Sequence, residues 1–142
     1  MIGLDANVLL RYLTADDAVQ SPLARDLIDG CLRDGEPLYV SLVTLVETIW
    51  TLRSAFGASR QDLCDTVVAL ATTDGVRLQE PDAVERAVAL SRATGCDLSD
   101  AIVGELGRAA GCAHTATFDI TSARTLDAME LIPAPGPPGG NG

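Results

Sequence analysis

The acidic residue Asp5 stands in a mostly apolar segment, IGLDANVLLRYL, with Asn7 two residues later. Aspartate is depleted from strands, and an ionised side chain is costly to bury unless it is paired or bound to a metal ion. The apolar residues on either side are typical of a strand followed by a helix. A charge held at that junction indicates a functional site.

Three further acids occupy comparable positions later in the chain. Glu47 lies in the early part of the helix expected after a second strand, Asp100 in the first turn of SDAIVGEL, and Asp119 at the end of CAHTATFD. In an open parallel sheet, ligands bind at the carboxyl ends of the strands and the starts of the following helices. Asp5, Glu47, Asp100 and Asp119 are therefore expected at one edge of the sheet.

Each of these acids also has a structural interpretation. Glu47 stands three residues after Thr44, as in a capping box. Asp97 and Asp100 each suit a helix start through the helix dipole, and Asp119 suits the start of a turn. The coincidence of four acids at one edge favours a site over four separate structural roles.

Four carboxylates in one pocket repel one another, by about 3 kcal/mol for each pair at roughly 5 Å and an effective dielectric of about 20. Such a cluster needs cations, raised pKa values or an arginine from elsewhere. Hard divalent cations prefer oxygen ligands, so Mg²⁺ or Mn²⁺ is the expected cofactor. Two such ions near a phosphodiester can orient and ionise a water.

The charge balance limits the chemistry further. The formal net charge is -10, and all ten basic residues are arginines. The absence of lysine excludes Schiff-base chemistry, phosphate-binding loops and lysine-dependent aspartyl-phosphate sites. An acidic chain also lacks the broad cationic face of non-specific nucleic-acid binding. Arg11 and Arg53, which follow the first two acids, are candidate substrate-phosphate contacts; the alternative for each is a surface ion pair.

Four cysteines are widely spaced, and the chain has a single histidine. We expect the four cysteines to be small buried residues in a reducing cytoplasm, not zinc ligands. The N-terminus has no basic region, and the longest uncharged apolar stretch, 38–46, is too short to cross a bilayer. These patterns predict a cytoplasmic protein without a membrane segment. The cysteines are Cys31, Cys64, Cys96 and Cys112.

Strands and helices are expected to alternate along one domain, residues 1–133, followed by a disordered Pro/Gly-rich tail, 134–142. Such alternation predicts the α/β class, with a mainly parallel sheet covered on both faces. The expected strands are 2–5, 38–41, 76–78, 112–119 and 129–132. The expected helices are 21–35 with Ser21 as N-cap, one through Glu47 ending at Gly57, one after Ser59, 81–95 ending at Gly95, and 99–111.

The segments that carry the acids resemble, in order, the motifs of the PIN-domain ribonucleases, in particular the VapC-type toxins of bacterial toxin–antitoxin pairs. LDANVLLRYLTADD resembles the family's opening, with Asp5 as first acid and Asn7 as the accompanying polar residue. SLVTLVETIWTL resembles the second motif, with Glu47. The residue after Asp5 is Ala6, where the family often has a hydroxyl residue.

The third and fourth motifs follow in the second half of the chain. CDLSDAIVGELGRAAGC resembles the third, whose acid falls at Asp100 rather than Asp97. TATFD resembles the fourth, with Thr117 as the supporting hydroxyl and Asp119 as the last acid. Four motifs in order with compatible spacing form a specific pattern, of which the Pro/Gly tail is no part.

The resemblance implies a three-layer α/β/α sandwich with a central parallel sheet. It also implies Mg²⁺- or Mn²⁺-dependent endonucleolytic cleavage of RNA, neutralisation by a cognate antitoxin and, by analogy, a homodimer. Asp5 and Asp100 would hold the principal metal, with Glu47 and Asp119 completing its shell or holding a second ion. Asn7 and Thr117 would position the carboxylates.

The antitoxin is expected to lay an apolar helix in a groove and place a cationic side chain among the carboxylates. Trp50 and Tyr12 are candidates to line that groove, and the alternative for Trp50 is burial in the core.

Two other functions compete with this interpretation. LDANVL loosely resembles the opening of haloacid-dehalogenase-like phosphatases, but the second acid is replaced by Asn7 and the catalytic lysine is missing. A receiver domain is excluded by the same lack of lysine. The alternative outside enzymology is a catalytically weak PIN-like module that binds RNA or a protein without cutting.

Overall fold

The computed structural model describes residues 1–136. Most of the tail predicted over 134–142 lies outside the described residues, and 134–136 belong to no helix or strand. Within the described range, no helix is both long and apolar enough to span a membrane.

Five short strands alternate with seven helices along the described chain. The strands are β1 (Ile2–Gly3), β2 (Leu38–Val40), β3 (Val76–Leu78), β4 (Thr115–Thr117) and β5 (Met129–Leu131). The helices are α1 (Ala6–Thr14), α2 (Gln20–Asp34), α3 (Leu42–Phe56), α4 (Arg60–Thr72), α5 (Pro81–Thr94), α6 (Leu98–Ala109) and α7 (Ile120–Thr125). Helix α7 was not expected from the sequence.

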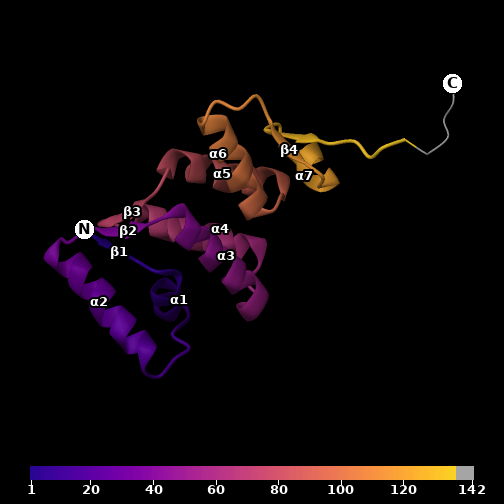
Figure 1. Cartoon of the computed structure of the whole chain (residues 1–142). Helices are drawn as coiled ribbons and strands as arrows, with labels where there is room; N and C mark the ends of the chain where they lie inside the picture. Colours follow the sequence, from indigo (N-terminus) through magenta and orange to yellow (C-terminus); the bar gives the residue numbers. More distant parts are fainter. Residues whose placement is uncertain (137–142) are drawn as a thin grey trace.

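All strand pairs are parallel, but the strands form two sheets, ordered β1-β2-β3 and β4-β5. The first sheet lies with α1 to α4 in the lower part of Figure 1, and β4 lies with α5, α6 and α7 in the upper part. The predicted α/β class with parallel strands is confirmed. Within residues 1–136, β1 pairs only with β2, and β4 only with β5.

One hydrophobic core runs through both parts of the molecule. It includes Leu9 and Leu38 from the first part and Leu98 and Ile102 from α6, each at most 1 % exposed. Helix α5 packs against both α4 and α6. The two sheets are therefore joined through helix packing, not through a strand pair.

Most helix ends follow the predicted local signals. Ser59 caps α4 in a capping box with Asp62, and glycines in the left-handed conformation end α3 at Gly57 and α5 at Gly95. The hydrogen bond from the Ser59 amide, followed by that from its hydroxyl, lowers the pKa of Asp62. These ends were predictable because a cap depends on residues within one turn of the chain.

The prediction of Ser21 as the N-cap of α2 was wrong. The carboxylate of Asp17 accepts hydrogen bonds from the amides of Val19 at 2.9 Å and Gln20 at 2.7 Å, so the helix begins before Ser21. Ser21 is buried inside the helix, and its hydroxyl oxygen accepts from the Asp17 amide.

Three further expectations about capping and burial were also wrong, those for Thr44, Trp50 and Cys112. Thr44 does not cap a helix at Glu47: Ser41 caps α3, and the Thr44 hydroxyl donates to the carbonyl of Leu4 at 3.1 Å. Trp50 is 68 % exposed. Cys112 is exposed, whereas Cys31, Cys64 and Cys96 are buried as predicted.

Candidate active site

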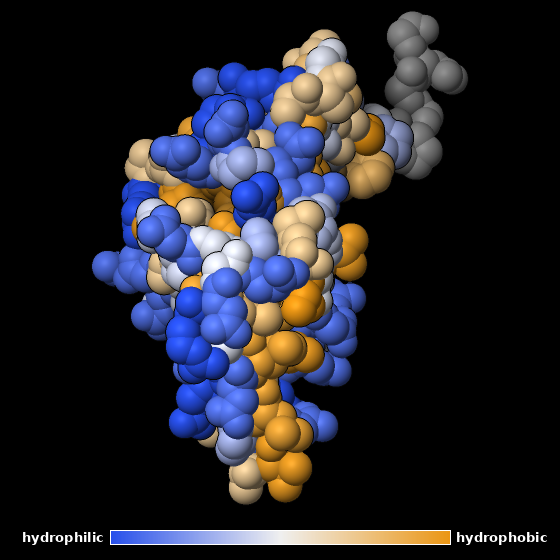
Figure 2. Space-filling model, turned by 90° about the vertical axis from the view of Figure 1, so that its left-hand side faces the viewer, coloured by the Kyte–Doolittle hydropathy of each residue, from blue (hydrophilic) through white to orange (hydrophobic). Residues whose placement is uncertain are grey.

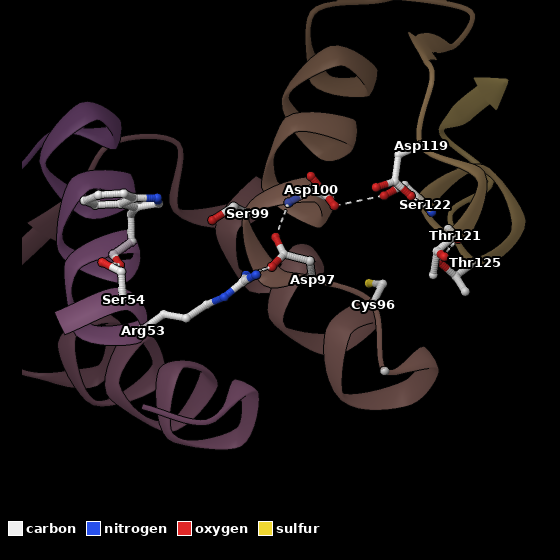
Figure 3. A pocket seen from close by; sticks show the side chains of 12 residues that line it. Arg53, Ser54, Cys96, Asp97, Ser99, Asp100, Asp119, Thr121, Ser122 and Thr125 are labelled. Carbon is white, nitrogen blue, oxygen red and sulfur yellow. Dashed lines mark hydrogen bonds and ion pairs between the residues drawn. The ribbon is translucent and has the colours of Figure 1, made fainter. Parts of the chain in front are cut away.

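A cavity of about 630 Å³ lies between α3, the start of α6 and α7 (Figure 3). One wall carries Trp50 and Arg53 from α3. Across from it, three acids line the cavity: Asp97 and Asp100 at the start of α6, and Asp119 before α7. Two of the four predicted site acids, Asp100 and Asp119, therefore share one cavity.

Asp100 is held by the N-terminal geometry of α6. Asp97 is the N-cap, and its Oδ1 accepts a hydrogen bond from the Asp100 amide at 3.0 Å. Asp97 is thus occupied in capping, which leaves the half-buried Asp100 carboxylate to face the cavity. Both acids therefore suit the helix dipole as considered, Asp97 as the N-cap and Asp100 in the first turn, and only Asp97 makes the capping hydrogen bond.

Asp119 is the N-cap of α7, where its Oδ1 accepts a hydrogen bond from the Ser122 amide at 2.8 Å. The hydroxyl oxygen of Thr117 accepts from the Asp119 amide at 3.0 Å. The Thr117 hydroxyl is therefore bonded to the main chain at Asp119 and not to its carboxylate.

Ser122 links these two acids and was missed from the sequence. It is 4 % exposed, and its hydroxyl donates to Asp100 Oδ2 at 2.9 Å while its amide donates to Asp119 (Figure 3). The spacing from Asp119 to Ser122 is that of an N-cap and its third helical residue. That signal was available, but the hydroxyl contact with Asp100 joins residues 22 apart in the chain and depends on the tertiary fold.

The two candidate phosphate-binding arginines lie in different places. Arg53 is exposed at the cavity and forms an ion pair with Asp97. Arg11 instead pairs with Asp16 at 2.8 Å, which is the surface ion pair considered as its alternative. The hydrogen bond from the Thr14 hydroxyl, followed by that from Arg11, lowers the pKa of Asp16.

The other predicted site residues lie outside the cavity that Asp100 and Asp119 share. Asp5 follows β1 and occupies the N-cap position of α1, but within that helix its carboxylate accepts no capping hydrogen bond. Glu47 is exposed on α3. Asn7 is exposed on α1 and lines a separate groove between α1 and α2.

The oxygen donors therefore do not assemble into a metal site in this conformation. Among residues 1–136, no group of three or more His, Cys, Asp or Glu side chains is placed to hold a metal ion. The reason is the division of the sheet, since Asp5 follows β1 and Asp119 follows β4, which are not paired. The cavity by itself supplies an acidic pocket faced by an arginine and a tryptophan.

A buried charge outside the cavity was also missed. Glu105 on α6 is 2 % exposed, accepts a hydrogen bond from Arg86 Nε of α5 at 3.0 Å, and lies 3.6 Å from Arg108 Nε. A buried carboxylate held by two arginines fastens α6, which carries Asp100, to α5. The spacing to Arg108, three residues later on the same helix, is a local signal, but the spacing to Arg86 on α5 carries none.

Comparison with protein families matches residues 2–125 to the PIN domain. A search of the curated proteins finds no match for the chain.

Proposed function

The chain belongs to the PIN domain family, a family of nucleases, and we propose that it is an Mg²⁺- or Mn²⁺-dependent endoribonuclease, the toxin of a toxin–antitoxin pair. The observation that supports a nuclease most directly is the family match over residues 2–125. The proposed location of the active site is supported by the cavity that Asp100 and Asp119 share and that Arg53 faces. The toxin role rests on the resemblance of the four acidic segments to VapC-type proteins.

Asp5, Glu47, Asp100 and Asp119 are the proposed catalytic and metal-binding residues, with Asn7 and Thr117 positioning them. Such a site requires Asp5 and Glu47 to approach the other two acids. Pairing of β4 with the free edge of β1 is the movement that would bring Asp5 to Asp119.

The main chain of β1 is suited to such a pair. The amides of Ile2 and Leu4 donate to the β2 side, at Pro37 O and Tyr39 O. Because amides and carbonyls alternate along a strand, the amide and carbonyl of Gly3 point to the opposite, free edge.

The same argument applies to β4. The amide of Thr115 donates to Ala128 O, and Thr117 O accepts from the Ile132 amide, both on the β5 side. The main-chain groups of Ala116 therefore point to the free edge of β4.

The spacing of the acids agrees with one register. Gly3 stands two residues before Asp5, and Thr117 stands two residues before Asp119. A parallel pair with Gly3 opposite Thr117 places Asp5 beside Asp119 at the carboxyl ends of neighbouring strands. Four oxygen-donor side chains there would select Mg²⁺ or Mn²⁺.

An antitoxin of basic character suits the net charge of -10. A mostly apolar groove between α1 and α2 is lined by Leu23 and Leu27, and Val19 is exposed in the same segment. Figure 2 shows a hydrophobic band over this part of the molecule. We propose that this groove binds the antitoxin. We also propose that the protein acts in the cytoplasm, where it meets its RNA substrate, and that it forms a homodimer, by analogy with the VapC-type toxins.

The test is incubation of purified, antitoxin-free protein with a mixed RNA pool, with Mn²⁺ or with EDTA. Cleavage that needs Mn²⁺ and is lost in Asp100→Asn is expected. If no RNA is cut but the protein still binds RNA, the chain is the catalytically weak PIN-like binding module, and the nuclease proposal is wrong.

A further inference from the structure

Among residues 1–136, Ser122 is the one residue that hydrogen-bonds to the carboxylates of both Asp100 and Asp119, two of the three acids of the cavity. Its hydroxyl donates to Asp100 Oδ2 at 2.9 Å, and its amide donates to Asp119 Oδ1 at 2.8 Å. The two contacts differ in kind. The hydrogen bond from the amide would survive any substitution except proline, whereas the hydrogen bond to Asp100 belongs to the side chain of Ser122 alone.

The position of Ser122 is well defined by its surroundings. It is 4 % exposed, in the third position of α7 after Asp119, and its carbonyl accepts from the Leu126 amide at 2.9 Å. Helix α7 packs against both β4 and β5. A hydroxyl held in this way aims its single proton, and here that proton is directed at Asp100.

The hydrogen bonds leave one oxygen of each acid available. Within residues 1–136, the described bonds of these carboxylates use Asp100 Oδ2 and Asp119 Oδ1. Asp100 Oδ1 and Asp119 Oδ2 remain for a ligand in the cavity. Without the hydroxyl, the mutual repulsion of the two carboxylates would favour turning Asp100 away.

We propose that Ser122 is a positioning residue of the reaction, which sets the orientation of Asp100 relative to Asp119. This inference rests on the proposed nuclease function and extends it to a residue outside the four acidic positions. Ser122 acts through Asp100 and does not touch substrate.

The experiment compares Ser122→Ala, Ser122→Thr and the control Thr66→Ala, whose hydroxyl donates to the Asp62 carbonyl within α4 and lies outside the cavity lining. On saturating RNA, we expect Ser122→Ala to lower kcat about tenfold, with KM and Tm close to those of the control. Ser122→Thr keeps the hydroxyl and is expected to recover most of kcat. Loss through KM alone, or kcat equal to that of the control, would overturn the proposal.

A second measurement needs neither RNA nor cleavage. The carboxyl ¹³C resonance of Asp100, followed by NMR in the whole protein, should shift in Ser122→Ala and stay in place in Thr66→Ala. If the resonance does not shift in Ser122→Ala, Ser122 does not orient the Asp100 carboxylate, and the proposal is wrong. If the resonance shifts but the protein cuts no RNA, the positioning of Asp100 by Ser122 is supported and only the proposed nuclease function is contradicted.

Discussion

Arg53 on α3 and Asp97, the N-cap of α6, form an ion pair across the cavity that Asp100 and Asp119 line. The same Asp97 carboxylate accepts the Asp100 amide. Asp97 therefore caps α6, the helix that carries Asp100, and also restrains Arg53, which faces the cavity. Because the Arg53 side chain is 61 % exposed, this pair contributes little to stability, and its consequence is for ligand binding.

Arg53→Ala is expected to raise KM for RNA about tenfold or more, since a hydrogen bond to a charged group is worth about 1.5–3 kcal/mol. Asp97→Asn keeps a good N-cap residue but frees Arg53, so KM should fall. Steady-state cleavage of a labelled RNA measures both. Arg33→Ala is the control because Arg33 pairs with its neighbour Asp34 on the surface. A KM for Arg53→Ala equal to that of the control would show that Arg53 binds no phosphate.

Trp50 is the single tryptophan of the chain and is 68 % exposed on the cavity wall. Stacking of a base on an aromatic ring is worth about 1–3 kcal/mol. Single-stranded RNA should therefore quench the Trp50 fluorescence, and Trp50→Ala should weaken RNA binding by about tenfold. Phe56→Ala, at the end of the same helix, is the control. Unchanged fluorescence at saturating RNA would contradict the stacking.

The pairing of β1 with β4 predicts which residues can be cross-linked. With Gly3 opposite Thr117, Ile2 lies opposite Ala116, at the distance of about 4.4–6.8 Å between Cα atoms that a disulfide spans. In a Cys112→Ser background, Ile2→Cys with Ala116→Cys should form an intramolecular disulfide on mild oxidation. Non-reducing electrophoresis distinguishes this product from a linked dimer.

The matched control for that cross-link is Ile2→Cys with Glu130→Cys. Glu130 pairs with Ala116 on β5, one strand further from β1. Equal yields from the two pairs, or a product that is only a dimer, would show that β4 does not add to β1 within one chain.

Asp100→Asn should abolish RNA cleavage and also raise the Tm of the metal-free protein. It removes one of the like charges in the cavity, and its side-chain oxygen can still accept the Ser122 hydroxyl. Thermal unfolding in EDTA measures the second effect, with Asp34→Asn as a surface control. A lower Tm for the metal-free variant would mean that the electrostatic argument is wrong.

Arg86→Ala is expected to destabilise the fold by about 3 kcal/mol, because it leaves the buried Glu105 carboxylate with Arg108 alone at 3.6 Å. Arg92→Ala breaks an exposed pair with Asp65 and should cost about 0–1 kcal/mol. Urea unfolding followed by circular dichroism compares the two. Equal losses would show that burial of Glu105 adds nothing.

The helical framework could be predicted because its signals are local. Gly57 and Gly95 end their helices, and Ser59 begins one, through contacts within a single turn. The start of α2 was misplaced because two polar residues, Asp17 and Ser21, compete as caps. Helix α7 was missed because its six residues carry too little periodicity to be recognised.

The sequence by itself determined the parallel α/β class, the family resemblance and the positions of Asp5 and Asp119 just after strands, since these depend on residue order and local pattern. Only the tertiary structure decided which groups meet: Asp100 with Asp119 through Ser122, and Arg53 with Asp97. Those contacts depend on how α3, α6 and α7 pack, which no local pattern records. The same holds for the separation of Asp5 from Asp119, which follows from strand pairing between distant segments.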